Sequence, residues 1–183
     1  MQSQTVARKL DYSDIERTPE DDGLRYEVLD GVLFVSPAPR PVHQRVSKRL
    51  QRQLENYFED KGLGEVFNAP VDVLLARHDI AVPDLVLVTQ PKLITERAIE
   101  GAPTLLVEVL SLSSRSRDRR LKMSRYAASG VPHYWIVDPV KQTIECYRLK
   151  GKHYTLVTSA KSPEKLTHPD WDGLTIDLDA IWK

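Results

Sequence analysis

Cysteine is almost absent from this sequence, because Cys146 is the only one among 183 residues. A single thiol excludes an internal disulfide and a zinc site built on several cysteines. No apolar run approaches the roughly 18 residues that a membrane-spanning helix needs. The first thirty residues are polar and acidic, without the apolar core of a signal peptide. We therefore expect a cytoplasmic protein without a membrane segment.

Several familiar motifs are missing too. The sequence contains no Walker loop, no dinucleotide-binding glycine fingerprint and no Gly-x-Ser-x-Gly nucleophile elbow. Its five histidines are scattered without the paired spacing of a metal site, so zinc is not expected. Cys146 alternates with apolar residues in a predicted strand, which favours a packed thiol over a nucleophile.

Neither sign of charge is in excess, since Lys+Arg and Asp+Glu number 26 each. The chain is therefore not a general polycation that coats nucleic acid. Its basic residues nevertheless gather in two stretches, which include Arg45, Lys48, Arg49 and Arg52 in the first and Arg115, Arg117, Arg119 and Arg120 in the second. Such clusters indicate either a local anionic ligand, such as nucleic acid, or solvated helix faces.

Strand and helix signals alternate along the chain. Asp30-Gly31 predicts the tight turn of a hairpin between strands at 25–29 and 32–36. Amphipathic helices are predicted at 42–61 and from Ser114 or Ser116 to Gly130. Further strands are predicted at 65–68, 71–76, 83–88, 105–110, 133–137, 144–149 and 154–158. This order predicts an α/β fold, with a mixed β-sheet flanked by helices.

Three carboxylates occupy positions where a core needs apolar side chains. Glu108 lies in a run that is apolar on both faces, and burying a carboxylate there is costly unless a cation, metal or proton compensates it. Asp84 opens a predicted strand, and Glu27 alternates with Leu29 in the hairpin. Each also has a plainer interpretation: a buried ion pair for Glu108, a strand-start carboxylate for Asp84 and a solvated position for Glu27.

Lys122 lies one helical turn after Asp118 and follows Glu108 in the chain. The spacing fits an ion pair within the helix, or a helix that returns Lys122 over the end of the Glu108 strand. Carboxylates beside an ammonium suit Mg²⁺, which prefers oxygen ligands and is usually held by one or two carboxylates. Such an ion activates water for phosphodiester hydrolysis, and a lysine can stabilise the charge of the transition state.

Together these residues resemble a known family. The matching segments are Tyr26-Glu27-Val28-Leu29-Asp30-Gly31, His43 at a helix start, Pro83-Asp84, Glu108-Val109-Leu110-Ser111, Asp118 to Lys122, Tyr126-Ala127 and Gly130-Val131-Pro132-His133-Tyr134-Trp135-Ile136-Val137-Asp138-Pro139. In this order they closely resemble the Uma-two family of the PD-(D/E)XK nuclease superfamily. The resemblance covers about residues 20 to 160 and is specific because many separate motifs occur in order.

The resemblance implies a restriction-endonuclease-like core and assigns roles to the acids. Asp84 matches the Asp of the motif, Glu108 its second acid and Glu27 the upstream acid of many members. The usual motif places lysine two residues after the second acid, where this sequence has Leu110. Lys122 looks like a migrated replacement. His43 matches a family histidine, but the favoured interpretation is a satisfied histidine at a helix start.

These observations predict an Mg²⁺- or Mn²⁺-dependent endonuclease that acts on DNA. Asp84 and Glu108 would bind the metal, and Glu27 and Lys122 would complete the catalytic set. The nuclease-like domain is placed at 23–160, between an N-terminal arm at 1–22 and a C-terminal extension at 161–183 packed on the same domain. A homodimer would suit the cutting of both strands of a duplex.

Two other functions stay open. Leu110 favours a non-catalytic nucleic-acid-binding module with a degenerate nuclease core. The basic clusters and the acidic ends of the chain would also suit an oligomer-forming interaction domain.

Overall fold

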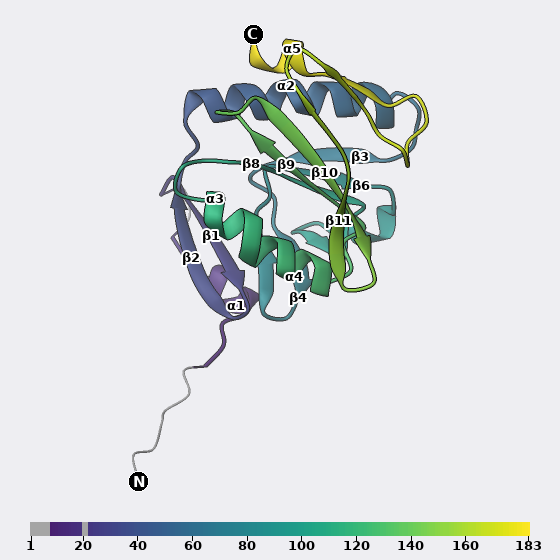
Figure 1. The fold of residues 1–183 in the computed structure, drawn as a ribbon. Helices are drawn as coiled ribbons and strands as arrows, with labels where there is room; N and C mark the ends of the chain where they lie inside the picture. The colour runs from purple at the N-terminus through teal and green to yellow at the C-terminus, as the bar shows by residue number, and fades with distance from the viewer. Residues whose placement is uncertain (1–7, 20–21) are drawn as a thin grey trace.

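The computed structural model describes residues 8–19 and 22–183, and Figure 1 shows how the elements are arranged. In chain order the elements are α1 (Tyr12–Ile15), β1 (Leu24–Leu29), β2 (Val32–Pro37), α2 (Pro41–Phe58), β3 (Glu65–Asn68), β4 (Val73–Ala76), β5 (Asp79–Ala81), β6 (Leu85–Val88), η1 (Pro91–Leu93), β7 (Ile99–Glu100), β8 (Leu105–Val109), α3 (Arg115–Arg117), η2 (Asp118–Lys122), α4 (Met123–Ala128), β9 (His133–Asp138), β10 (Thr143–Lys150), β11 (His153–Lys161), β12 (Lys165–Thr167), β13 (Thr175–Asp177) and α5 (Leu178–Trp182).

The larger sheet has six strands in the order β11-β10-β9-β8-β6-β3. β8 and β9 run parallel, and the other neighbours are antiparallel. A parallel pair needs a crossover connection, which α3, η2 and α4 provide. In Figure 1 the long helix α2 runs along one side of this sheet, and the α3–α4 segment runs along the other. The predicted α/β fold with a mixed sheet between helices is therefore confirmed.

The predicted hairpin belongs to a second, five-stranded sheet with the order β2-β1-β5-β4-β7. Asp30 and Gly31 both have positive φ, 53° and 79°, as a two-residue turn of this kind requires. The register places Glu27 opposite Phe34. β5, which joins β1 to β4, was not predicted because its three residues give too short a pattern.

The two faces of the six-stranded sheet pack into separate cores. On one face Val107 and Val109 of β8 join Leu50 and Leu54 of α2 in a buried cluster. On the other, Leu106 packs in a second cluster with residues of the five-stranded sheet and α4. Because side chains alternate along a strand, Glu108 shares the face of Leu106. The carboxylate of Glu108 therefore points into the layer between the two sheets and α4.

The predicted second helix runs from Arg115 to Ala128, but it is not uniform. Asp118–Lys122 forms a π-helical segment between α3 and α4. Short π segments within α-helices are rare and occur frequently at functional sites. This segment carries both Asp118 and Lys122, the two helical residues that the sequence singles out.

Both ends of the described chain pack on the sheets. Ile15 of α1 lies in a small core cluster with Val28 and Ile80. Near the other end, Ile176 and Ile181 join the cluster beneath α2. The proposed boundaries at 22 and 160 stay a prediction, and residues 1–7 and 20–21 of the arm lie outside the described residues. Among the described residues, no helix is long and apolar enough to cross a membrane.

Candidate active site

Three of the four predicted catalytic residues meet in the layer between the two sheets. Lys122 Nζ lies 2.7 Å from Glu27 Oε1 and 2.8 Å from Glu108 Oε1. These three side chains come from η2, β1 and β8, and each is at most 5% exposed. The helix thus returns Lys122 over the Glu108 strand, and its ammonium bridges carboxylates from both sheets.

Asp118 completes this cluster from within η2. Its Oδ1 atom lies 3.9 Å from Lys122 Nζ, so the contact within the helix is the longest of the three. That oxygen is buried and has no hydrogen-bond partner among the described residues. Burial raises the pKa of Asp118, and Lys122 only partly opposes the effect. The carboxyl group of Asp118 is therefore an incompletely satisfied member of the site.

Asp84 lies just before β6 and is held separately from Lys122. Its carboxylate accepts hydrogen bonds from Arg25 Nη1 at 3.0 Å and from the Val109 backbone amide at 2.8 Å. His43 Nε2 lies 3.1 Å from the other side of the same group. Burial alone would raise the pKa of Asp84, but His43, Arg25 and the amide outweigh it and lower the pKa. Asp84 therefore stays a carboxylate.

Glu108 has the opposite electrostatic character. Burial raises its pKa to about 8, with the negative charges of Asp118, Asp84 and Glu27 acting in the same direction against Lys122. The Tyr126 hydroxyl donates to Glu108 Oε1 over 2.8 Å. Burial thus shifts Glu108 towards its protonated form, and a further cation would shift it back.

The carboxyl groups of the site offer the oxygen ligands that a hard divalent cation prefers, although among the described residues no three of them bring ligand atoms within 4.8 Å of one another. Glu27, Glu108 and Asp118 lie around the buried Lys122 ammonium, and the fourth buried carboxyl group, that of Asp84, pairs with the Arg25 guanidinium. The raised pKa of Glu108 and the unpartnered oxygen of Asp118 both mark a shortage of positive charge. Oxygen-rich sites of this kind suit Mg²⁺ or Mn²⁺, and a bound cation would favour the ionised carboxylates.

The sequence matches the family model described as "Uma2: Putative restriction endonuclease" over residues 11–179. The chain belongs to the Uma2 family. This is the Uma-two family that the motifs already indicated, and the match extends beyond residues 20 to 160 at both ends.

One solved structure supports the same fold for this Uma2 chain. It is the crystal structure of a "putative nuclease belonging to DUF820" from Anabaena variabilis. The two share 16% sequence identity with a TM-score of 0.76, and the alignment covers 94% of this chain and 97% of the other. At this identity the likeness establishes the fold alone. No curated protein matches the sequence significantly.

The eight basic residues predicted to bind nucleic acid do not form one surface. Arg45, Lys48, Arg52 and Arg120 are exposed. The other four make contacts within the protein: Arg49 with the backbone carbonyls of Ile181 and Lys183, Arg115 with Asp138, Arg117 with Ser36, and Arg119 with Glu145. A role in DNA binding stays a prediction for all eight.

Three residues of the site were not assigned from the sequence of this Uma2 protein. His43 is not simply a satisfied histidine at a helix start, because Nε2 contacts Asp84 while Nδ1 is buried without a partner among the described residues. Arg25 holds Asp84, and Tyr126 holds Glu108. Two spacings could have indicated them: Arg25 shares a strand face with Glu27, and Tyr126 follows Lys122 by one helical turn.

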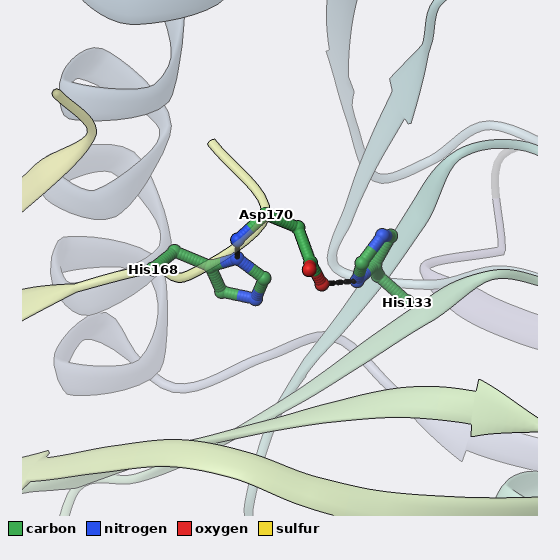
Figure 2. A group of neighbouring side chains, drawn as sticks. All are labelled: His133, His168 and Asp170. Atoms are coloured by element: carbon green, nitrogen blue, oxygen red, sulfur yellow. Dashed lines mark hydrogen bonds and ion pairs between the residues drawn. The ribbon is translucent and has the colours of Figure 1, made fainter. Parts of the chain in front are cut away.

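The fold also gathers histidines that are scattered in the sequence. Figure 2 shows His133 from β9 beside His168 and Asp170, with one potential ligand atom of each within 4.8 Å of the others. Burial lowers the pKa of both histidines, that of His168 to about 4.

This second group does not fit a metal well. Asp170 donates its amide to His168 Nδ1, so the neutral ring carries its proton on Nε2 and offers neither nitrogen freely. Arg148 also pairs with the Asp170 carboxylate. We interpret the group as packing, in which both imidazoles lie against the Trp171 ring.

Proposed function

We propose that this protein is a divalent-metal-dependent endonuclease that hydrolyses phosphodiester bonds in DNA. The observation that carries the proposal is the buried Lys122 ammonium between Glu27 and Glu108. A purely structural ion pair needs one carboxylate for one ammonium. Here the Lys122 ammonium lies within 3.9 Å of three carboxyl groups, those of Glu27, Glu108 and Asp118. Arg117 lies 3.8 Å from Glu27, and Asp84, which Arg25 compensates, lines an open cavity.

Asp84 and Glu108 would hold Mg²⁺ or Mn²⁺. A bound ion of this kind polarises the phosphoryl oxygen, lowers the pKa of a bound water and stabilises the leaving oxygen. Arg25, His43 and the Val109 amide keep Asp84 ionised and fixed in orientation. Tyr126 fixes the orientation of Glu108 by donating its hydroxyl to Oε1.

Lys122 would supply the positive charge that a metal-dependent nuclease needs beside its acids. Its pKa is raised, because the nearby carboxylates outweigh the effect of burial, so the side chain remains an ammonium. Preorganised charge in a buried site stabilises a developing phosphoryl charge without reorganisation. Glu27 holds Lys122 in place at 2.7 Å and accepts the Val82 amide at 3.0 Å.

This chain has Leu110 where the motif has lysine, and we infer that Lys122 takes over the role of that lysine. Leu110 is buried in the apolar cluster between the sheets and α4, on the same side of the chain as Glu108, and it brings no charge to that carboxylate. The ammonium of Lys122 reaches the Glu108 carboxylate from the neighbouring helix instead. The charge that the motif requires is therefore present although its position in the sequence differs.

Cleavage of supercoiled plasmid and of linear duplex DNA, with Mg²⁺, Mn²⁺ or EDTA, tests the proposal. Wild type should cut only with the metals, and Glu108→Gln should reduce the rate by about 100-fold or more while remaining folded. Glu96→Gln, an exposed acid in a loop, is the matched control and should cut like wild type. Binding of DNA without any metal-dependent cutting would instead establish the non-catalytic module.

One observation favours assembly as a second property. β2 is an edge strand of its sheet, and Val32, Leu33 and Val35 on it are 56%, 40% and 48% exposed. Exposed apolar edge strands are sites where other chains pair. We propose a homodimer through β2, which light scattering of wild type and Val35→Lys would test. A monomeric wild type would contradict it.

A further inference from the structure

We infer that the cavity beside Asp84 is a nucleotide subsite, in which the protein contacts one base next to the phosphate that is cut. This inference rests on the proposed nuclease function and deepens it, because it names an element that would read the substrate. The cavity has a volume of about 340 Å³, within the range of small-molecule sites.

The walls of the cavity come from two elements. α2 contributes residues spaced one turn apart, His43, Ser47 and Gln51, together with Gln44 and Lys48. Residues three and four apart share a helix face, so these side chains form one continuous stripe. Asn68 at the end of β3 and Ala69 after it also line the cavity, as does Asp84 of the candidate active site.

The lining has the chemistry of a base-reading surface. Gln44 offers an amide donor and an amide acceptor, and Ser47 offers a hydroxyl. Gln51 and Asn68 offer their amide oxygens and one N–H each, because the other N–H donates to Glu55 and to the Ala69 carbonyl. Such groups pair with the donor and acceptor edges of nucleobases, and glutamine and asparagine pair with adenine in two hydrogen bonds. A subsite for phosphate alone would instead present several cations, whereas Lys48 is the only basic side chain beside His43 in this lining.

His43 connects the cavity with the candidate active site, because it lines the cavity and contacts Asp84. Its Nδ1 atom is buried and has no hydrogen-bond partner among the described residues, while Nε2 contacts Asp84 at 3.1 Å. Leaving a buried polar atom unpaired is unfavourable, so such atoms usually have a partner. His43 thus both contacts Asp84 and lines the cavity. A nucleotide bound in the cavity would be separated from Asp84, the candidate metal ligand, by one side chain.

Cleavage of a duplex library with a randomised central segment, followed by sequencing of the cut ends, tests the subsite. Wild type with Mn²⁺ should prefer one or two bases by roughly 5- to 100-fold at a fixed position next to the cut. Gln51→Ala and Gln44→Ala should flatten this preference. The readout is a ratio between bases and is therefore independent of the overall rate.

Asn56→Ala is the matched control, because Asn56 is an exposed amide on the same helix that does not line the cavity. It should keep the base preference of wild type. Cutting by wild type without any preference at a fixed position would overturn the subsite, as would a preference that both glutamine variants retain.

Failure of the nuclease proposal is distinguishable from failure of the subsite. If wild type does not cut the library, the same duplexes are selected for binding to the protein with Ca²⁺ present. Enrichment of a base that Gln51→Ala abolishes would keep the subsite in a binding module. Absence of enrichment would overturn the subsite as well.

Discussion

Lys122 is the residue on which the candidate site depends. Its ammonium lies within 2.8 Å of carboxylates from two sheets, so it holds together acids that would otherwise repel one another. Breaking a buried ion pair of this kind leaves charge uncompensated and is strongly destabilising. The same residue therefore contributes to stability and, under the proposed function, to catalysis.

Glu108 predicts a characteristic dependence of stability on pH. Its pKa is about 8 in the folded protein and near 4.5 when unperturbed, so the folded state binds more protons between these values. The free energy of unfolding should therefore fall as pH rises from about 4.5 to 8. Glu108→Gln removes this loss, so the stability of the variant relative to wild type should increase by roughly 4 kcal/mol from pH 5 to pH 8.5.

Urea unfolding at pH 5 and pH 8.5 without divalent metal measures this difference. Glu96→Gln, which replaces an exposed acid, should follow wild type at both values. An equal change with pH in wild type and Glu108→Gln would show that Glu108 titrates normally in the folded protein.

Single residues also mark the limit of what the sequence predicts. A carboxylate in the apolar strand around Glu108 is visible as a pattern, because burial of such a group requires compensation. The sequence pattern does not predict which residues contact the buried acids. Arg25 and His43 lie 59 and 41 positions from Asp84 in the numbering, and only the fold brings them to it.

At the scale of elements, α2 combines three functions on separate faces. Its buried face carries Val46, Leu50, Leu54 and Phe58. A second face lines the cavity, and Arg49 donates to the carbonyls of Ile181 and Lys183 at the end of α5. The periodicity of apolar residues predicts the first face, whereas the partners of the polar faces depend on elements distant in the chain.

This division predicts different effects for neighbouring arginines. Arg49→Ala should destabilise the protein by about 1–3 kcal/mol, because it removes hydrogen bonds from a charged donor that hold α5. Arg45→Ala, on the exposed face, should change stability by less than about 0.5 kcal/mol. It should lower DNA affinity and reduce the slope of log affinity against log salt by about 1.

Thermal unfolding and salt-dependent DNA binding of both variants measure these effects. If Arg49→Ala lowers DNA affinity but leaves the stability unchanged, the structural role of Arg49 is contradicted. Unchanged DNA affinity and salt slope in Arg45→Ala would contradict binding through this face of α2.

Helix bounds and local helix geometry depend on backbone hydrogen bonds that the amphipathic pattern does not predict. The sequence predicts α2 to extend to residue 61, but the helix ends at Phe58, and the Leu63 amide then donates to the Phe58 carbonyl. The second helix is placed correctly by its caps, but its π-helical segment at Asp118–Lys122 has no signal in the amphipathic pattern. It nevertheless decides which side chains face Glu108.

At the scale of the molecule, the sequence predicts the six-stranded sheet better than the five-stranded one. β8 and β9 are mainly apolar runs, and β10 alternates buried with more exposed residues. β5 and β7 have three and two residues, too few to show a period. The candidate site lies where the two sheets meet, since Glu27 comes from one and Glu108 from the other. Its composition was therefore more predictable than its geometry.

The central claim is that Asp84 and Glu108 form a divalent-metal site. Titration calorimetry of wild type with Mn²⁺ and Mg²⁺, compared with Asp84→Asn and Glu108→Gln, tests it most directly. We expect wild type to bind metal and to release protons near pH 7, because Glu108 must ionise, and both substitutions to abolish binding. Absence of binding to wild type even with DNA present, or binding that survives both substitutions, would contradict the account.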